Sequence, residues 1–292
     1  MPELPEVETT VLGLKKEVLG KKILDCIAQT KKIIKKPKNF ELFKKEIKGT
    51  MIEKIWRRGK NIIFELSNKK FMLVHLKLTG HFLIGKWKQE NKQWIPIDKN
   101  EALRDPMNRF LRVIFFLDDG RQLALSDLRK FAKIEILTKE ELERTLSKIG
   151  PEPLDENFTL EKFKEILGKV KKGKIKKVLM DQEKIAGIGN IYSDEILWES
   201  KVHPEKDVRK LKEKEIETIF TAIKKILKKG LENGGESFSD FRKITGERGE
   251  FDKERKVYRR EGEECFRCKS KIKRIKIGQR SSYFCPVCQK ND

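Results

Sequence analysis

Apolar and polar positions alternate with a helical period at the start of the chain and with a strand period soon after it. Between residues 5 and 20 apolar side chains recur every three or four positions, which predicts a helix that ends at Gly20. Residues 22–30 have the pattern of a strand. Asn39 is a good N-cap, so we expect a short helix from there to about Gly49.

Strand patterns dominate the region that follows. Short runs rich in β-branched and aromatic residues are separated by turn residues, and Asp119-Gly120 is typical of a hairpin turn. The strands predicted most clearly are residues 61–66, 71–78, 110–117 and 123–126. Thr138, with Glu141 three positions later, predicts a capping box that opens a helix to Ile149. The first half is therefore expected to be a β-rich layered structure with flanking helices.

The second half of the chain has a helical pattern. Residues 150–153 carry two prolines in four positions and are the best candidate for a boundary between the halves. The helices predicted beyond it are residues 159–167, 175–184, 192–200 and 210–229. The predicted fold class is therefore α+β.

The charge balance narrows the choice of partner. The 292 residues include 68 Lys or Arg against 46 Asp or Glu, a formal net charge of +22. This excess indicates a polyanion, with nucleic acid ahead of an acidic membrane surface. Adaptation to a hot habitat is an alternative source of part of the excess. No apolar run reaches roughly 18 residues and the first residues lack the order of a signal peptide, so we expect a cytoplasmic protein without membrane association.

Four of the five cysteines lie close together near the end of the sequence. Cys265 and Cys268 form one C-x2-C pair, and Cys285 and Cys288 form another, which is the spacing of a four-thiolate zinc site. Four protein ligands leave no open coordination position, so we expect one structural Zn2+ per chain. Residues 253–292 contain 13 Lys or Arg and 5 Asp or Glu, which favours a finger that contacts phosphates over a merely solvated basic surface.

The first residues carry a second kind of chemistry. Removal of Met1 would leave Pro2 with a free secondary amine beside the carboxylate of Glu3. An α-amino group has a pKa of roughly 7.7–8.0, so an appreciable fraction is a neutral nucleophile near pH 7, and its attack on a sugar aldehyde carbon gives a Schiff base. The carboxyl beside it is placed to move protons. The alternative is that Pro2 and Glu3 only start a helix, and these residues alone favour that alternative.

A glycine-rich turn in the second half favours phosphate binding. Residues 187–192 lead into a helix, and the backbone N–H groups of such a helix start form an anion site to which Asn190 can add a donor. The alternative is a tight turn between helices. The nearby Lys171 and Lys172 favour the phosphate interpretation.

Three short motifs next to predicted strands carry further candidate residues. Lys60 ends a basic turn before a strand and is a candidate charge brought back over the N-terminus. Leu78 follows an apolar strand, and Arg129 lies close to Phe131 after another strand. A large apolar side chain beside an arginine suits the filling of a vacated position in a base stack. Without further context, Lys60 would be a surface lysine, and Leu78 and Phe131 would be core residues.

Together these motifs resemble those of the formamidopyrimidine-DNA glycosylase family of bifunctional DNA-repair enzymes. The resemblance runs from Pro2 to Cys288 in the family's order, and it is most specific in residues 2–8, 180–192 and 279–288. It implies a β-sandwich, a helical domain with a helix-two-turn-helix element and a zinc finger, with DNA across the cleft between the domains. The corresponding boundaries are 1–137 for the catalytic β-sandwich, 138–157 for a linker helix and hinge, 158–252 for the helical domain and 253–292 for the finger.

The resemblance also implies the catalytic roles. Pro2 would be the Schiff-base nucleophile, and Glu3 would protonate the opening sugar. Lys60 would assist β-elimination, and Arg280 would serve δ-elimination and phosphate binding.

The resemblance further implies which residues contact DNA. Arg129, Phe131 and the wedge Leu78 would fill the void left by the flipped nucleotide. The residues implied to bind phosphates are Asn190, Lys171 and Lys172. Residues 237–251 would form the loop that covers the flipped base.

The sequence departs from the family pattern at two places. Leu78 stands where the family usually has methionine, so the wedge is branched and stiffer here. Phe110, Leu111 and Arg112 stand where the family usually has a histidine pair. Arg109 or Arg112 is therefore a candidate for the DNA contact that histidine makes.

Two alternative functions share part of the pattern. A non-catalytic zinc-ribbon protein explains the charge and the cysteines but not a proline amine beside a carboxylate. An endonuclease VIII-type enzyme, which removes oxidised pyrimidines, typically has glycine where Leu4 stands here. We therefore predict a bifunctional DNA glycosylase/AP lyase of base excision repair that removes oxidised purines and cuts the strand by β,δ-elimination. Its expected partner is damaged double-stranded DNA. We expect it to act as a monomer without a protein partner, at the nucleoid in a bacterial-type cytoplasm.

Overall fold

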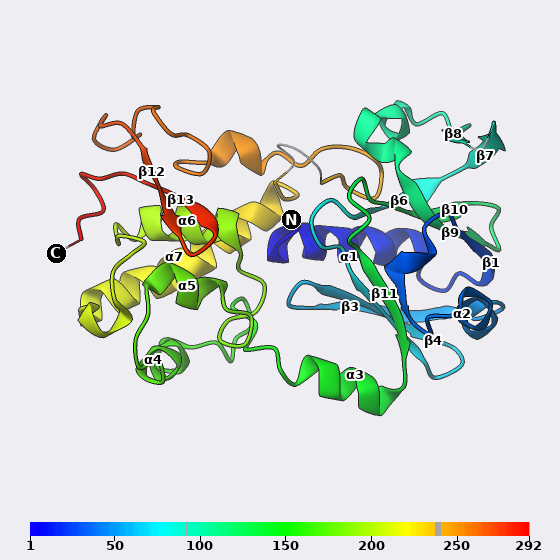
Figure 1. Ribbon diagram of the computed structural model, residues 1–292, viewed down its shortest axis with the longest axis horizontal. Coiled ribbons are helices and arrows are strands. Elements are labelled where there is room, and N and C mark those ends of the chain that lie inside the picture. Colours follow the sequence, from blue (N-terminus) through cyan, green and yellow to red (C-terminus); the bar gives the residue numbers. More distant parts are fainter. Residues whose placement is uncertain (92, 237–240, 292) are drawn as a thin grey trace. The chain divides into compact units, whose positions relative to one another are not determined.

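The computed structural model describes residues 1–91, 93–236 and 241–291 of the chain (Figure 1). The described residues form two compact units. The first unit contains Met1–Ser147 and the described part of Asn233–Asp252, and the second unit contains Lys148–Glu232 and the described part of Lys253–Asp292. These units are defined by contacts within the folded chain, whereas a domain is a part that folds by itself. The predicted domain boundaries therefore stay predictions.

Three helices of the first unit begin at capping residues. They are α1 (Leu4–Val18), α2 (Phe40–Ile47) and α3 (Lys139–Leu146). The side chain of Asn39 accepts hydrogen bonds from two backbone N–H groups at the start of α2, and Thr138 forms the predicted capping box of α3. The three predicted helices are confirmed, although each ends two or three residues before its predicted stop.

Two sheets form the body of the first unit. The four-stranded sheet has the antiparallel order β1 (Ile23–Ala28), β9 (Leu111–Leu117), β10 (Gln122–Ser126) and β6 (His81–Gly85). The five-stranded sheet has the order β2 (Ile34–Lys36), β11 (Lys133–Leu137), β5 (Phe71–His75), β4 (Asn61–Leu66) and β3 (Ile52–Arg58). Only the pair β2 and β11 is parallel among these strands. The β-rich layered first half is therefore confirmed.

The strand predicted for residues 71–78 ends too late. β5 stops at His75, because Lys77 adopts a positive φ of 58° and turns the chain. The N–H of Gly80 then donates to the carbonyl of Leu76 at 3.1 Å. A Cβ atom at Gly80 would lie 2.4 Å from that carbonyl oxygen, so only glycine closes this turn.

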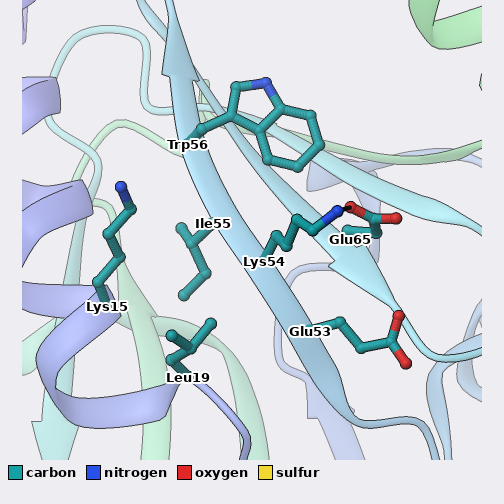
Figure 2. Close-up of a pocket in the computed structure, with 7 residues that line it drawn as sticks. All are labelled: Lys15, Leu19, Glu53, Lys54, Ile55, Trp56 and Glu65. Atoms are coloured by element: carbon teal, nitrogen blue, oxygen red, sulfur yellow. Dashed lines mark ion pairs between the residues drawn. The ribbon is translucent and has the colours of Figure 1, made fainter.

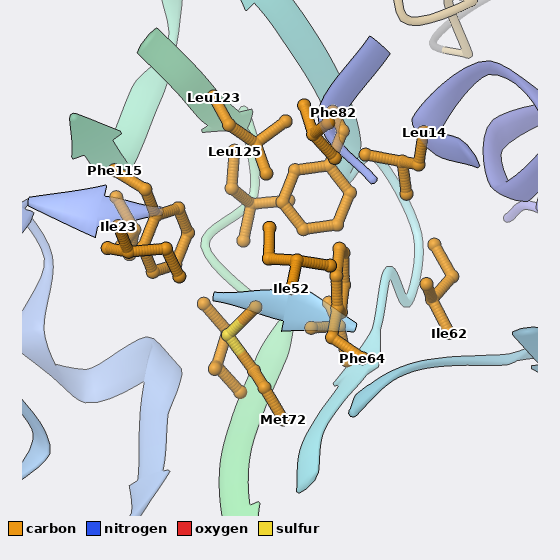
Figure 3. Close-up of a cluster of buried hydrophobic side chains, with 14 of the residues drawn as sticks. Leu14, Ile23, Ile52, Ile62, Phe64, Met72, Phe82, Phe115, Leu123 and Leu125 are labelled. Carbon is orange, nitrogen blue, oxygen red and sulfur yellow. The ribbon is translucent and has the colours of Figure 1, made fainter. Parts of the chain in front are cut away.

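Alternate side chains of both sheets pack into one core (Figure 3). Helix α1 packs against β3, β4 and β6 and adds Leu14 to this core. The rings of Phe64 and Phe82 meet edge to face with centroids 5.9 Å apart. Further core residues drawn in Figure 3 are Ile23, Ile52, Ile62, Met72, Phe115, Leu123 and Leu125.

Smaller elements complete the first unit. They are the hairpin of β7 (Trp87–Glu90) and β8 (Gln93–Pro96) and the 3-10 turns η1 (Lys31–Ile33), η2 (Glu101–Arg104) and η3 (Pro106–Arg109).

The second unit is helical and ends in a small hairpin. Its elements are α4 (Leu160–Gly168), α5 (Ile175–Met180), α6 (Asn190–Glu199), η4 (Val208–Lys210), α7 (Glu213–Glu232), β12 (Lys273–Ile277) and β13 (Arg280–Phe284), and η5 (Phe251–Glu254) lies where the chain returns to this unit. All four predicted helices are present, but α5 ends four residues early. Gln182 explains the early end, since its amide bonds the backbone of Met180, Gly187 and Ile188 and shapes the turn into α6.

The α+β fold class is confirmed by these elements. Among the helices of the described residues, none combines the length and apolar composition that a membrane span requires.

The core makes one prediction about stability. Phe64→Ala should lower the free energy of unfolding by about 3–5 kcal/mol, because it empties a ring-sized space between the two sheets. Phe131→Ala is the matched control, since that ring is 48% exposed and its loss leaves no cavity. Urea unfolding of both variants measures the difference, and equal costs would contradict the assigned core.

Candidate active site and nucleic-acid interface

The start of α1 holds the two predicted catalytic residues in a buried setting. Met1 is exposed, whereas Pro2 and Glu3 are buried. The backbone N–H of Glu3 donates to Oε2 of Glu6 at 2.7 Å. The other oxygen of Glu6 accepts from the backbone N–H of Glu236 at 2.8 Å. Glu6 therefore fixes the N-cap of α1 against a segment 230 positions further along the chain.

The turn that carries Lys60 is fastened to the same helix. Lys60 follows Gly59, which has a positive φ of 55°, and its side chain is buried. Arg57 donates from Nε to Oε2 of Glu8 at 2.6 Å and from Nη1 to the carbonyl of Gly59 at 3.2 Å. One arginine thus ties the Lys60 turn to α1, the helix that begins beside Glu3.

The charge of Lys60 also acts on β5. Burial, together with the charges of Lys77, Lys60 and Lys133, lowers the pKa of His75 to about 3. His75 is therefore neutral near pH 7, and its Nδ1 accepts the backbone N–H of Lys77 at 3.0 Å. Because the His75 ring is neutral, it adds no positive charge near Lys60.

A buried carboxylate shapes the loop that carries Arg129. Asp127 is fully buried and accepts the hydroxyl of Thr79. Its two oxygens also accept the backbone N–H of Arg129 at 3.2 Å and of Ala132 at 2.8 Å. The hydroxyl oxygen of Thr79 accepts the same Arg129 N–H at 3.0 Å. The backbone on both sides of the loop is therefore fixed.

The side chains of this loop point outward. Arg129 is exposed and Phe131 is 48% exposed, with the guanidinium 5.0 Å from the ring centroid. Leu78 is half-buried in the neighbouring turn. An exposed cation and ring on a fixed loop suit insertion into a base stack.

Arg112 and Arg109 flank the ring of Phe110, with guanidinium carbons 5.6 Å and 4.9 Å from its centroid. Arg112 donates from Nε to the carbonyl of Asp127 at 2.8 Å, so it supports the Arg129 loop. Arg109 is exposed, forms no ion pair with the described acidic residues, and lines a groove of about 360 Å3 with Trp94. Of the two arginines, Arg109 is therefore the better candidate for a DNA contact.

A buried ion pair organises the second unit. Lys176 Nζ lies 2.7 Å from Oδ1 of Asp194, and both side chains are almost fully buried. Asp194 also accepts the backbone N–H of Tyr283 at 3.0 Å, and Lys176 donates to the carbonyl of Ser281 at 3.1 Å. Burial raises the pKa of Asp194, and the ammonium of Lys176 opposes the rise. This pair joins α5 and α6 to strand β13, where Arg280 is the first residue.

The predicted phosphate-binding residues belong to the same unit as this ion pair. Arg280, Lys171 and Lys172 are exposed. Arg280 and Lys177 line a groove of about 340 Å3 between α5 and the β12–β13 hairpin. Asn190 is the first residue of α6, at the helix end where backbone N–H groups are available to an anion. Exposed cations and a helix start suit a polyanion.

The four cysteines predicted to bind zinc converge. The sulfur atoms of Cys265, Cys268, Cys285 and Cys288 lie within 4.8 Å of one another. Tetrahedral Zn–S bonds of about 2.3 Å place sulfur atoms roughly 3.8 Å apart, and the measured pairs of 4.0 Å and 3.3 Å bracket that value. The donor set therefore fits one structural Zn2+.

Another groove, of about 560 Å3, lies beside β3, and Figure 2 shows the side chains that line it. Its polar groups include the ion pair of Lys54 and Glu65 at 3.4 Å. None of the predicted site residues lines this groove, so we assign it no part in the site.

The sequence-predicted residues divide between the two units. Within the first unit lie Pro2, Glu3, Lys60, Leu78, Arg129 and Phe131, and within the second lie Lys171, Lys172, Asn190, Arg280 and the four cysteines. Part of the predicted base-covering loop, residues 237–240, lies outside the described residues. The roles of Arg57, Thr79, Asp127 and Lys176 were not predicted, because their hydrogen bonds join distant segments and leave no local pattern.

These features describe a protein with a four-thiolate site of the zinc-binding kind and exposed cations suited to a polyanion. Three family models match it. They are the formamidopyrimidine-DNA glycosylase N-terminal domain at residues 1–134, the formamidopyrimidine-DNA glycosylase H2TH domain at residues 149–242, and the zinc finger found in FPG and IleRS at residues 262–291.

Full-length relatives agree with these models. Formamidopyrimidine-DNA glycosylases of Herpetosiphon aurantiacus and Streptococcus mutans are 36% and 38% identical, each over 99% of this chain and all of the relative. A solved complex of the Lactococcus lactis enzyme with DNA containing Fapy-dG has a TM-score of 0.85 at 35% identity, covering 99% of this chain and all of that chain. The chain belongs to the formamidopyrimidine-DNA glycosylase family, and it carries the family's structural zinc site.

The zinc site makes one prediction. Cys268→Ser or Cys285→Ser should lower bound zinc from one per chain toward none and weaken DNA binding, because three thiolates hold the metal poorly and the hairpin loses its staple. Cys26→Ser is the matched control, since Cys26 is buried in the sandwich core. Elemental analysis after dialysis measures the metal. Metal-free protein with normal DNA affinity would show that the finger is dispensable.

Proposed function

We propose that this protein is a bifunctional DNA glycosylase and AP lyase of base excision repair that excises oxidised purines from damaged double-stranded DNA. Full-length membership in the family supports the glycosylase activity and the substrate class. The observation that carries the mechanism is the anchored start of α1, where Glu6 fixes the N-cap beside Pro2. Full-length matches to formamidopyrimidine enzymes disfavour the endonuclease VIII-type and zinc-ribbon alternatives.

The first chemical step belongs to Pro2. After removal of Met1, its neutral secondary amine attacks C1′ of the damaged nucleotide, and the C1′–base bond breaks. Because the ring nitrogen is secondary, the product is a charged iminium that acts as an electron sink. Glu3 protonates the opening sugar and later moves protons on and off it.

Strand cutting follows from the iminium. It acidifies the proton on C2′, whose loss expels the 3′ phosphate by β-elimination, and a second elimination expels the 5′ phosphate. Lys60 assists the first elimination as a proton donor. Arg280 assists the second and binds phosphate.

The remaining candidates hold the DNA in a flipped state. Extrusion of the damaged nucleotide costs a few kcal/mol of unstacking, and a plug in the void prevents reclosure. Arg129, Phe131 and Leu78 form this plug. Asn190, Lys171 and Lys172 bind phosphates, and residues 237–251 cover the extruded base.

The working context follows from the substrate. The similar enzymes come from bacteria such as Streptococcus mutans and Bacillus cereus, and their substrate class is DNA. We place the protein at the nucleoid in the cytoplasm, acting as a monomer without a protein partner.

The proline assignment gives a direct prediction. Any extension that retains Met1 should abolish base excision and strand cutting while DNA binding persists, because an acylated proline nitrogen is a tertiary amide without a nucleophilic lone pair. The same tag at the C-terminus is the control and should leave activity intact. Borohydride reduction with an 8-oxoguanine duplex, followed by mass spectrometry of the N-terminal peptide, should locate the trapped sugar on Pro2. Full lyase activity from the blocked protein would exclude Pro2.

The Arg129 assignment predicts a preference for the base opposite the lesion. Its guanidinium finds acceptors on O2 and N3 of cytosine, whereas adenine offers a poorer pattern and its own amino group. A well-placed arginine–base contact contributes about 1–3 kcal/mol, so we expect about tenfold or more faster excision opposite cytosine. Arg129→Ala should lose most of this preference, whereas Leu78→Ala should slow excision opposite either base. Single-turnover excision rates opposite all four bases measure this preference. An unchanged preference in Arg129→Ala would show that Arg129 does not contact the opposite base.

A further inference from the structure

A buried histidine and a buried asparagine lie behind the Arg129 loop. His81 is the first residue of β6 and Asn108 lies in η3, and both are 1% exposed. Nε2 of His81 lies 2.9 Å from Oδ1 of Asn108, and Nδ1 lies 3.2 Å from the carbonyl of Thr79. Neither residue belongs to the catalytic or DNA-contacting sets assigned above.

The orientation of Asn108 determines which nitrogen of His81 carries the proton. The amide nitrogen of Asn108 donates to the carbonyls of Ala102 at 2.8 Å and Gly246 at 3.1 Å. Its oxygen therefore faces His81 and can only accept, so Nε2 of His81 is the donor. Burial lowers the pKa of His81 to about 4, which keeps the ring neutral with this one proton.

Two further contacts join the η2–η3 region, which contains Asn108, to the segment 241–248. Asp105, three positions before Asn108, accepts a hydrogen bond from Nη2 of the buried Arg242 at 3.0 Å. At Gly246 φ is +89°, and a Cβ atom would lie 2.8 Å from the carbonyl oxygen of Ala102. The segment is therefore packed against η2 and η3 without space for a side chain at this point.

The other end of the network reaches Arg129. The carbonyl of Thr79 faces His81, and the hydroxyl of the same residue contacts both Asp127 and the backbone N–H of Arg129. A continuous path of contacts thus runs from Gly246 through Asn108, His81 and Thr79 to Arg129. Each step is a hydrogen bond except the one between His81 and Thr79, where the unprotonated Nδ1 packs against the carbonyl at 3.2 Å.

We infer that His81 and Asn108 are positioning residues that hold the Arg129 loop in register with the segment 241–248 and thereby set the preference for the base opposite the lesion. This inference rests on the proposed function. It assigns the two residues no contact with DNA: they act through Thr79 on the direction in which the guanidinium points. A displaced loop keeps the nucleophile intact but loses the directional contact with cytosine.

The test compares three reactions in three variants. His81→Phe keeps the ring and removes the donor, His81→Gln keeps a donor near the position of Nε2, and Asn108→Ser shortens the acceptor. The reactions are single-turnover excision of 8-oxoguanine opposite cytosine, the same opposite adenine, and cutting at a preformed abasic site. Asn68→Ser is the matched control, since Asn68 donates to the carbonyl of Glu46 at 2.8 Å on an exposed turn.

His81→Phe and Asn108→Ser should lower the cytosine preference from about tenfold to about threefold or less, while abasic-site cutting stays within about twofold of the parent. His81→Gln should retain the preference, and Asn68→Ser should match the parent in all three reactions. In a double variant with Arg129→Ala, His81→Phe should lower the preference no further, because both act through one contact.

Three results would overturn the inference. They are an unchanged preference in both disrupting variants, an equal loss of all three reactions, and an additive loss in the double variant. If His81→Phe does not fold, Asn108→Ser and His81→Gln still decide the question. Failure of the proposed function is a separate result, since the parent protein itself would then excise 8-oxoguanine opposite neither base.

Discussion

The arrangement of the first unit depends on the buried carboxylate of Glu6. One oxygen accepts the backbone N–H of Glu3, and the other accepts that of Glu236. A buried carboxylate is costly unless its oxygens are hydrogen-bonded, so both partners are needed for the group to be stable there. The positive end of the α1 dipole adds to this stabilisation. Gly235 completes the contact, because its φ is +84° and a Cβ atom would lie 2.9 Å from Cγ of Glu6.

Buried carboxylates that accept backbone N–H groups also occur at other functional segments. Asp127 accepts the N–H groups of Arg129 and Ala132, and Asp194 accepts that of Tyr283. Glu195 accepts three consecutive N–H groups, those of residues 256–258, and so fixes the chain that leads into the zinc finger. In each case a buried carboxylate accepts backbone N–H groups of a segment that carries, or leads to, a functional residue. The catalytic and DNA-contacting side chains can then extend from loops whose backbone is fixed.

The sequence predicted the local features and missed the connections between them. Thr138 and Asn39 were identified as caps because capping is a contact over three or four residues. Each C-x2-C pair is equally local, and the recurrence of the pair is a known zinc-site pattern, so the sulfur cluster was predicted although its two halves are 17 to 23 positions apart. The ends of β5 and α5 were wrong, because a positive φ at Lys77 and the side chain of Gln182 stop these elements. The links through Glu6 and His81 join residues far apart in the chain, and no period or spacing records them.

The exposure of apolar groups around Arg129 follows from the anchored loop. Leu128 and Phe131 are 42% and 48% exposed, and leaving such side chains in water forgoes up to about 1.5–3 kcal/mol of burial each. A mobile loop would fold them onto the sandwich. Here the N–H groups of Arg129 and Ala132 are held by the buried Asp127, so the side chains of Leu128 and Phe131 cannot fold inward. An apolar surface that is kept exposed beside a cation matches the faces and edges of unstacked bases, which is the surface that a flipped nucleotide leaves behind.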